Sequence, residues 1–514
     1  MPLRRLGCLL AVALAALLAG CAGLPSPEGR SESHAFADTA DTRLGRSLAA
    51  SEAAHPGETG IHPLPVPYDA FAARYLLATA AQKSLDVQYF QWNDDEVGSL
   101  LLDALCQAAA RGVRVRMLLD DLNTEGFDPT LAALDGKPNI EVRLYNPFVL
   151  RNARALDFLS DFRRLNRRMH NKSFTADNQV TIVGGRNIGN EYFGAGPGVG
   201  FADLDVIAVG AAVREVSQEF DLYWNSASAY PAAGLVGAPP ADADAVLQAR
   251  FATMRGDAEG LAYIDAVKAT QLRRDLLEGQ IALQWTRAVL VYDDPAKTLD
   301  TSGRTDVLLF PELMQTMGRP QQTLDMVSPY FVPGDEGTAA LAALAERGVR
   351  VRILTNSLAA TDVKAVHAGY ARRRADLLAA GVHLYELKPS ALNASPTAAA
   401  RFGSRTSSAL HAKTFAVDRA RIFVGSFNFD QRSAHLNTEM GLVIDSPPLA
   451  GELADALHNA PTTAYEVRRS ADGQLEWIEA TGSGQTRYDA EPDTSWLLRR
   501  QVDFLSILPI ESLL

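Results

Sequence analysis

The sequence has 514 residues, 61 of them acidic and 49 basic, which gives a formal net charge of −12. A chain of this length exceeds what one hydrophobic core organises, so we expect more than one domain. The acidic balance argues against a general nucleic-acid binder, because a polyphosphate partner attracts basic surfaces.

The first twenty residues are typical of a bacterial lipoprotein signal. Arg4-Arg5 precedes an apolar run from Leu9 to Leu18, and Leu18-Ala19-Gly20-Cys21 has the form of a lipoprotein cleavage box. The run is about ten residues, which is short for a bilayer span of about twenty. We therefore predict a signal peptide over 1–20 and lipidation of Cys21. An ordinary secretory signal and an uncleaved anchor are the alternatives.

Such a signal predicts a location in the bacterial cell envelope, on the periplasmic side, with the mature protein tethered to the membrane by acyl chains. Ala22 follows the cysteine in place of Asp, which favours the outer over the inner membrane by the enteric sorting habit. Cys8 leaves with the signal and Cys21 is acylated, so Cys106 has no disulfide partner. We expect Cys106 to be a buried, inert thiol.

Composition and apolar periodicity divide the remainder of the chain. Residues 21–62 are rich in small and charged residues without a sustained apolar period, which predicts a flexible tether. The stretch from Pro389 to Ser408 is similarly loose and is a candidate mobile lip. The other predicted parts are a first module (63–230), a connecting segment (231–304), a second module (305–465) and a C-terminal extension with an amphipathic tail (466–514).

The two modules repeat each other. Arg111 to Leu118 reads Arg-Gly-Val-Arg-Val-Arg-Met-Leu, and Arg347 to Leu354 repeats it with Ile in place of Met. Leu85 to Phe90 is echoed by Leu324 to Phe331 at a similar offset. Within each module, short apolar runs alternate with helical periodicity, which predicts an α/β fold. The sequence therefore indicates one α/β module that was duplicated and fused.

The same reactive pattern occurs once in each module. His and Lys are two residues apart, Asp follows five residues after the Lys, and a Gly-x-x-Asn comes next; the two sets are His170, Lys172, Asp177, Gly184 and Asn187, and His411, Lys413, Asp418, Gly425 and Asn428. Each set reads as a β-hairpin with the Asp at its turn. Residues two apart on a strand share a face, so imidazole and ammonium point at one spot, where a phosphate would fit. A single copy could be a solvated surface strand, but duplication favours a catalytic site.

The twin motifs resemble those of the phospholipase D superfamily. Four further segments are similar to the bacterial cardiolipin synthase C type: Arg168 to Phe174, Gly184 to Gly189, Phe201 to Val206, and Leu508 to Glu511. The resemblance implies two fused phospholipase D-like α/β modules related by a pseudo-dyad, with the active site at their interface.

The chemistry requires two imidazoles in opposite protonation states. A neutral histidine attacks phosphorus and forms a phosphohistidine, while a protonated one donates to the leaving oxygen. By family habit we expect His170 to be the nucleophile, and the sequence leaves His411 open. Lys172 and Lys413 are expected to neutralise phosphate oxygens, and the predicted hydrogen-bond donors to phosphate are Asn187, Ser426 and Asn428.

Each imidazole needs a carboxylate to fix its tautomer. Glu439 follows His411 by 28 residues and is its expected partner; Asp203 is the counterpart for His170, with Asp205 as a rival. Asp177 and Asp418 belong to the catalytic motifs, and their place at hairpin turns indicates a structural or long-range electrostatic role. Where the second module has Ser426, the first has Gly185, so the two half-sites differ.

The resemblance further implies a phosphatidyltransferase that makes cardiolipin, with phosphatidylethanolamine as donor and phosphatidylglycerol as acceptor. The same residues could serve a phospholipid hydrolase, and a nuclease or a non-catalytic membrane scaffold are more remote alternatives. The expected partners are phospholipids and the membrane; no metal or other cofactor is required, and no nucleic acid is expected. Two amphipathic stretches, Phe158 to Arg168 and Trp496 to Leu508, are candidate lipid contacts, although a solvated helix face or packing across the modules would explain them too.

Overall fold

The computed structural model describes Leu24 and residues 30–196, 199–278, 280–299, 304–391, 407–482 and 484–514. The predicted signal peptide, Cys21 and residues 392–406 of the predicted lip lie outside these ranges. Within them, no helix is both long and apolar enough to cross a membrane.

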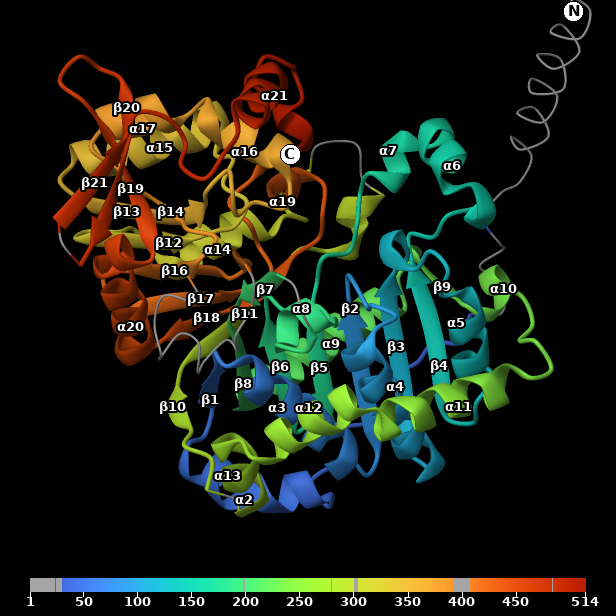
Figure 1. Ribbon diagram of the computed structural model, residues 1–514. Coiled ribbons are helices and arrows are strands. Elements are labelled where there is room, and N and C mark those ends of the chain that lie inside the picture. The colour runs from blue at the N-terminus through green and yellow to red at the C-terminus, as the bar shows by residue number, and fades with distance from the viewer. Residues whose placement is uncertain are drawn as a thin grey trace, which may run out of the picture.

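Two sheets of mixed strand direction organise the chain (Figure 1). In spatial order, the first contains β10 (Gln284–Thr286), β1 (Thr59–Leu64), β8 (Asp205–Gly210), β6 (Val180–Gly184), β5 (Ser173–Ala176), β2 (Ser84–Tyr89), β3 (Arg114–Asp120), β4 (Ile140–Tyr145) and β9 (Ala229–Pro231). The second contains β11 (Ala288–Tyr292), β18 (Met440–Asp445), β17 (Arg421–Gly425), β16 (Lys413–Val417), β12 (Thr323–Val327), β13 (Arg350–Asn356), β14 (His383–Leu387), β19 (Ala464–Arg469), β20 (Leu475–Thr481) and β21 (Gly484–Tyr488).

The strand orders confirm the predicted repeat. From β1 to β9 and from β11 to β19 the two sheets run through equivalent strands in the same spatial order. In both, two parallel pairs (β2 with β3 and β3 with β4; β12 with β13 and β13 with β14) lie beside an antiparallel hairpin. The predicted α/β class is therefore correct, and each His motif belongs to the hairpin of its own sheet.

Helices cover the outer faces of the sheets and fill the spaces beside them. In the first module they are α2 (Arg43–Ala54), α3 (Pro67–Ala80), α4 (Glu96–Ala110), α5 (Asp128–Asp135), α6 (Arg154–Ser160), α7 (Phe162–Leu165), α8 (Asn190–Phe193), α9 (Ala211–Trp224), α10 (Ala233–Val236), α11 (Ala243–Gly256), α12 (Ala258–Lys268) and α13 (Gln271–Glu278). In the second they are α14 (Leu309–Met317), α15 (Gly334–Glu346), α16 (Lys364–Ala371), α17 (Arg374–Ala379), α19 (Gln431–His435), α20 (Pro447–His458) and α21 (Trp496–Ser506). Cys106 is buried within α4, as predicted, and burial raises the pKa of its thiol to about 12.

An apolar interface joins the modules. Side chains from β6, β8 and α9 pack against others from β11, β17, β18 and α20; they include Val183, Val206, Val216, Leu290, Val424, Leu442 and Leu449. Their burial removes apolar surface from water, which favours one fixed arrangement of the two sheets. The two His hairpins are consequently held next to each other.

The predicted tether over 21–62 is wrong for its described C-terminal half. Thr42 caps α2 by accepting a hydrogen bond from the Gly45 amide, and β1 pairs with β8 and β10. Upstream, the amide of Ala35 donates to Asp221 at 2.8 Å. The composition lacks apolar periodicity because these residues are ordered by contacts with the first module and not by an apolar face of their own.

The predicted connecting segment 231–304 also has its own structure. It supplies α10 to α13, strand β10 to the first sheet and strand β11 to the second. Similarly, the predicted C-terminal extension completes one edge of the second sheet with β20, β21 and most of β19. These parts are integral to the modules.

Candidate active site

Both His motifs begin hairpins whose turns are fixed by the motif aspartates. Asp177 and Asp418 have φ angles of 52° and 53°, and the residue after each is also at positive φ, as a two-residue hairpin turn requires. The Asp177 carboxylate accepts hydrogen bonds from the backbone amides of residues 82–84, and Asp418 does the same for residues 321–323. These two aspartates therefore tie each hairpin to the start of its neighbouring strand, in agreement with a structural role.

Backbone pairing across the module boundary brings the two motifs together. The His170 amide donates to Thr438 O at 2.8 Å, and the Thr438 amide donates to Arg168 O at 2.9 Å. On the other side, β15 (Ser407–Leu410) runs parallel to β7 (Val199–Ala202), and the His411 amide donates to Ala202 O at 2.8 Å. The residue after each acceptor, Glu439 or Asp203, is thereby placed beside the histidine of the other module.

The orienting carboxylates are consequently exchanged between modules. His170 Nδ1 donates to Glu439 at 2.8 Å, and His411 Nδ1 donates to Asp203 at 2.7 Å. Each imidazole contacts one of the two predicted acids, but the expected pairing of Glu439 with His411 and of Asp203 with His170 is wrong. That expectation followed proximity within each module, whereas the cross-module strands decide the partner. With Nδ1 occupied, Nε2 of each ring is the atom that could react with a substrate, and at His411 this atom lies 3.1 Å from Lys413 Nζ.

The rival acid Asp205 has a different role. Its carboxylate contacts Arg74 at 2.8 Å and Arg186 at 3.2 Å, and all three side chains are buried. The Arg186 guanidinium also donates to Leu64 O and Asp203 O. Arg186 thus braces the backbone that carries Asp203, a function that the motif spacing alone did not reveal.

The two half-sites differ around the carboxylates. Glu439 accepts hydrogen bonds from Ser426 Oγ at 2.5 Å and Ser433 Oγ at 2.7 Å. Ser426, predicted to bind phosphate, thus donates to an orienting acid here. At the equivalent position, a Cβ on Gly185 would lie 2.2 Å from Asp203 Oδ1, so only glycine leaves room for the shorter acid.

The two predicted asparagines have buried polar atoms available to a ligand. Asn187 Oδ1 and Asn428 Oδ1 are buried and have no hydrogen-bond partner among the described residues, while Asn187 Nδ2 donates to the Tyr192 hydroxyl at 2.9 Å. Buried polar atoms are nearly always paired, so unpaired ones beside a reactive centre indicate where a polar ligand sits. Rotation of either amide would present its NH₂ group to a phosphate oxygen.

Burial controls the protonation of the cationic groups. It lowers the pKa of His170 and of His411 to about 4, although Glu439 and Asp203 partly oppose the shift. It also lowers the pKa of Lys172 to about 7 and of Lys413 to about 8. Burial would raise the pKa of Asp203, but His411 and Lys413 outweigh it and lower the value to about 2. A bound phosphodiester would add negative charge and raise the pKa of both lysines and both imidazoles.

A sequence profile described as "Cardiolipin synthase, PLD-like domain" matches residues 77–224 and 313–460, more than half of the chain. Cardiolipin synthase C of Escherichia coli (strain K12) is 46% identical over 462 residues, which cover 90% of this chain and 97% of that protein. The chain belongs to the phospholipase D-like cardiolipin synthase family. Cardiolipin synthase A of Pseudomonas aeruginosa (strain LESB58) is a more distant member, 26% identical over 78% of this chain and 68% of that protein.

The fold is also found among solved structures. The crystal structure of phosphatidylserine synthase from Haemophilus influenzae Rd KW20 aligns with a TM-score of 0.52 and 14% identity, covering 90% of this chain and 96% of that chain. This similarity is one of architecture.

Several residues of this family site escaped the sequence reasoning. The Phe90 ring meets His170 edge-on with centroids 4.9 Å apart, and Tyr192 and Phe201 enclose His411 at 5.0 and 5.2 Å. Arg168, expected to face lipid, is buried and contacts Asp120 at 2.7 Å. An aromatic residue near a strand end carries no spacing signature, so only the folded arrangement identifies these neighbours.

Glu219 supports the His170 loop from behind. Asn171 Nδ2 donates to Glu219 at 2.7 Å, and Thr438 Oγ1 donates to Asn171 Oδ1 at 2.8 Å. These buried contacts connect α9 of the first module to the residue before Glu439. Burial raises the pKa of Glu219 to about 8, so its carboxyl group is largely neutral at pH 7.

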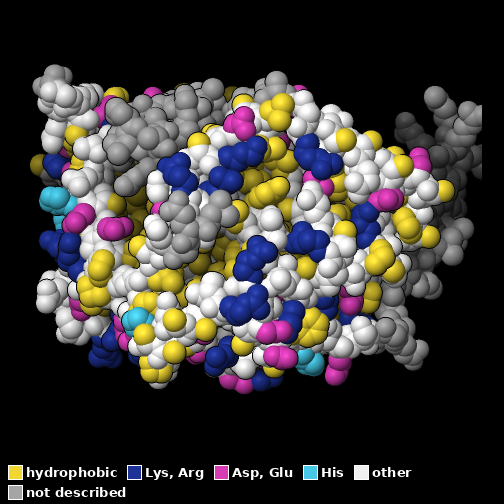
Figure 2. Space-filling view, turned by 90° about the horizontal axis from the view of Figure 1, so that it is seen from below, with side chains coloured by type: hydrophobic (Ala, Val, Ile, Leu, Met, Phe, Trp, Pro, Cys, Tyr) yellow, Lys and Arg dark blue, Asp and Glu magenta, His cyan; other side chains and the backbone are white. Residues whose placement is uncertain are grey.

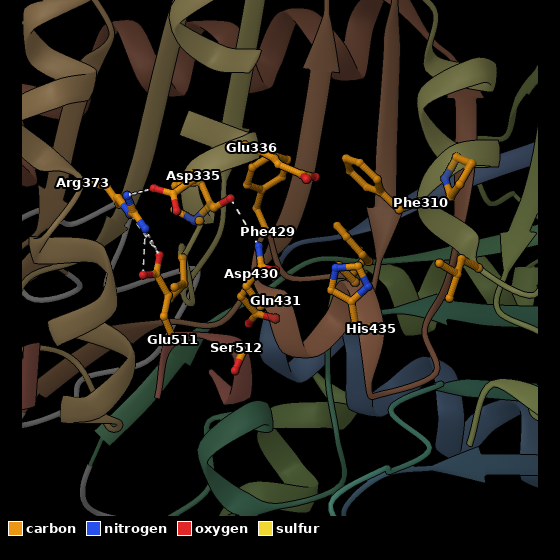
Figure 3. Close-up of a pocket in the computed structure, with 18 residues that line it drawn as sticks. Phe310, Asp335, Glu336, Arg373, Phe429, Asp430, Gln431, His435, Glu511 and Ser512 are labelled. Carbon is orange, nitrogen blue, oxygen red and sulfur yellow. Dashed lines mark hydrogen bonds and ion pairs between the residues drawn. The ribbon is translucent and has the colours of Figure 1, made fainter. Parts of the chain in front are cut away.

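A separate cavity of about 570 Å³ is lined in part by α19, and neither His170 nor His411 lines it (Figure 3). Arg373 at its wall is already paired with Glu511 at 2.8 Å and with Asp335. Its charged groups therefore fix the C-terminal tail against the second module, and we do not assign the cavity to the transfer reaction.

Proposed function

We propose that this protein is a cardiolipin synthase that transfers a phosphatidyl group from phosphatidylethanolamine to phosphatidylglycerol through a phosphohistidine. The observation that carries the proposal is the pair of imidazoles, each oriented by a carboxylate of the opposite module and each accompanied by a lysine. The 46% identity to cardiolipin synthase C supports the lipid product.

In the first step, the Nε2 lone pair of His170 attacks the donor phosphorus. The bond from phosphorus to the ethanolamine oxygen breaks, and protonated His411 gives its proton to that oxygen, so free ethanolamine leaves. Lys172 and Lys413 stabilise the charge on the other phosphate oxygens. The product of this step is a phosphatidyl group bonded to His170 and a neutral His411.

In the second step, neutral His411 takes the proton from a glycerol hydroxyl of phosphatidylglycerol. The hydroxyl oxygen attacks phosphorus, the bond to His170 breaks, and cardiolipin is released. His411 ends protonated and His170 neutral, which restores the starting state.

The unequal carboxylates support His170 as the nucleophile. Glu439 shares its charge with two serine hydroxyls, so it stabilises an imidazolium less and leaves His170 neutral. Asp203 accepts no serine hydroxyl at the position of Gly185, but Lys413 Nζ lies 2.9 Å from His411 Nδ1 and opposes protonation of that ring. A substrate phosphate beside Lys413 would offset its charge, and Asp203 would then favour His411 as the proton donor.

The lipoprotein reading of the amino terminus is part of the proposal. Acylation of Cys21 would hold the enzyme on the periplasmic side of a bacterial membrane, and we favour the outer membrane because Ala22 follows the cysteine. Such a tether keeps the active site within reach of lipids that do not leave the bilayer.

The test is mass spectrometry of lipids after reconstitution of the protein into vesicles of phosphatidylethanolamine and phosphatidylglycerol. Cardiolipin from the parent protein and none from His170→Ala or His411→Ala is the expected result. A phosphatidyl group recovered on a peptide containing His170 would identify the nucleophile. Phosphatidic acid as the only product would show that water is the acceptor and would replace the synthase with a hydrolase.

A further inference from the structure

Most of the strongly exposed large apolar side chains belong to two helical segments. In the described part of the chain, seven such side chains are 60% exposed or more, and six of them lie on α6 or on α21 and the residue after it. These six are Leu156 (63%), Leu159 (78%), Trp496 (63%), Leu497 (61%), Phe504 (60%) and Ile507 (74%). Single exposed apolar residues are ordinary on a protein surface, but a concentration of them marks an interaction site.

Helix α21 is apolar on two faces. Leu498, Val502 and Leu505 form one face, which packs beside α16. Trp496 and Phe504, eight residues apart, belong to the other side and remain exposed. The exposed side also carries Arg500 and Asp503, so it combines apolar and charged side chains, and the exposure of Trp496 and Phe504 shows that the described structure leaves this side uncovered.

The α6–α7 segment presents its apolar side in a fixed orientation. The buried carboxylate of Asp157 accepts hydrogen bonds from the amides of Val149 and Leu150, which anchors α6. Leu156 and Leu159, on the other side of this helix, extend into solvent. Arg163 follows them on α7 and is exposed.

Both segments are attached to the structure next to the active site. Arg432 on α19 donates to Asn166 Oδ1 at 2.7 Å, directly after α7, and to Leu513 O at 2.9 Å, near the end of the chain. The next residue, Ser433, is the one that donates to Glu439. Figure 1 shows α6, α7 and α21 on the same upper side of the molecule.

We infer that α6, α7 and α21 with Ile507 form a membrane-docking face that seats the enzyme on a bilayer with anionic headgroups. The exposed Arg163 supplies positive charge beside aliphatic side chains, the combination that interfacial helices use, and Arg500, paired with Asp503 at 3.0 Å, lies beside Trp496 on α21. The choice of a lipid surface as the occupant rests on the proposed phospholipid chemistry. A bilayer on this face would lie on the same side of the molecule as α19, whose Ser433 donates to Glu439, the partner of His170.

A rival face lies on the opposite side. Figure 2 views the molecule from below, where Lys and Arg side chains gather. Helices α2 and α13, which lie lowest in Figure 1, contribute the exposed Arg43, Arg46 and Arg274. This side would hold a membrane by charge, whereas the docking face would insert apolar side chains; the two modes can be separated by experiment.

Trp496 provides a direct probe of insertion. Trp92, Trp224 and Trp477 are buried and Trp285 is half-buried, so Trp496 is the most accessible tryptophan. The full-length protein is reconstituted into phosphatidylethanolamine and phosphatidylglycerol vesicles whose acyl chains carry bromine, a quencher of tryptophan emission. We expect quenching that disappears in Trp496→Phe. Absence of quenching, or quenching that persists in Trp496→Phe, overturns the inference.

A second measurement links docking to turnover. Leu156→Ser with Leu159→Ser, and separately Leu497→Ser with Phe504→Ser, should lower cardiolipin formation in intact vesicles by about five- to tenfold. Turnover in detergent-mixed micelles should stay unchanged. Val246→Ser, at an equally exposed position on α11, is the matched control.

The outcomes are distinct. If Arg43→Glu, Arg46→Glu and Arg274→Glu together abolish turnover on vesicles while the apolar variants do not, docking belongs to the face in Figure 2 and the inference fails. If Trp496 is quenched by the lipid but the parent makes no cardiolipin, docking stands and the proposed function fails.

Discussion

The exchange of carboxylates between modules predicts which acid variant and which histidine variant lose rate with the same substrates. Asp203 accepts a charged hydrogen bond from His411 at 2.7 Å, and both side chains are buried. If His411 is the acid that protonates the leaving group, Asp203→Asn lowers the fraction of His411 that carries the proton and leaves the nucleophile intact. Glu439→Gln should instead weaken the nucleophile His170.

The magnitude follows from the loss of one hydrogen bond to a charged group. Such a bond contributes about 1.5–3 kcal/mol, which corresponds to about a 10- to 150-fold loss of rate. The Asp203→Asn loss should appear with phosphatidylethanolamine, whose leaving alkoxide needs a proton. It should nearly vanish with a phosphatidyl ester of p-nitrophenol, because that leaving group is stable without protonation.

The assay compares release of ethanolamine and of nitrophenol for four variants. Asp203→Asn should follow the profile of His411→Ala, and Glu439→Gln should follow that of His170→Ala by losing rate with both substrates. This comparison does not depend on an assumed nucleophile, because each acid variant is matched to a histidine variant. A match of Asp203→Asn with His170→Ala would refute the exchanged pairing.

Three further predictions concern groups behind the imidazoles. Glu219→Gln should retain activity, and Glu219→Ala should lose it. The pKa of Glu219 is about 8 in the folded protein and near 4.5 in the unfolded chain, so the parent should lose stability as the pH rises from about 4.5 to 8. Thermal unfolding of Glu219→Gln should not show this loss. Gly185→Ala should displace Asp203, since the added Cβ would lie 2.2 Å from its Oδ1, and cardiolipin formation should fall at least as far as in Asp203→Asn. Asp177→Ala should lower the free energy of unfolding by about 1–3 kcal/mol, because the buried Ser84 amide and two partly buried amides lose their acceptor. Asp418→Ala, at a more exposed turn, should cost less in denaturant titration, and equal losses would contradict this reasoning.

The sequence predicted those features that depend on residues close together in the chain. The hairpins follow from alternation and turn residues such as Asp177 and Asp418, and the repeated strand order follows from the duplicated apolar runs. The partner of each imidazole depends on Thr438 and Ala202, whose carbonyl groups pair with backbone of the other module, and no spacing within one module encodes that. The order of residues 30–62 was missed for the same reason, since β1 gains its stability from strands far away in sequence.

The exchange also gives a physical reason for two fused modules. One module alone contains a histidine and a carboxylate that do not meet, so it cannot orient its own imidazole; each half completes the other.

Once both halves belong to one chain, their sequences can diverge separately. Both carboxylates lie at similar distances from Nδ1 of their histidines, but their surroundings differ. Asp203 is next to Gly185, whereas Glu439 accepts a hydrogen bond from Ser426. The Asn171–Glu219 support adds to the difference, because Ala412 occupies the corresponding position in the second motif. A reaction that needs one neutral and one protonated histidine gains from such an asymmetric pair, whereas two identical half-sites would have no built-in preference for either role.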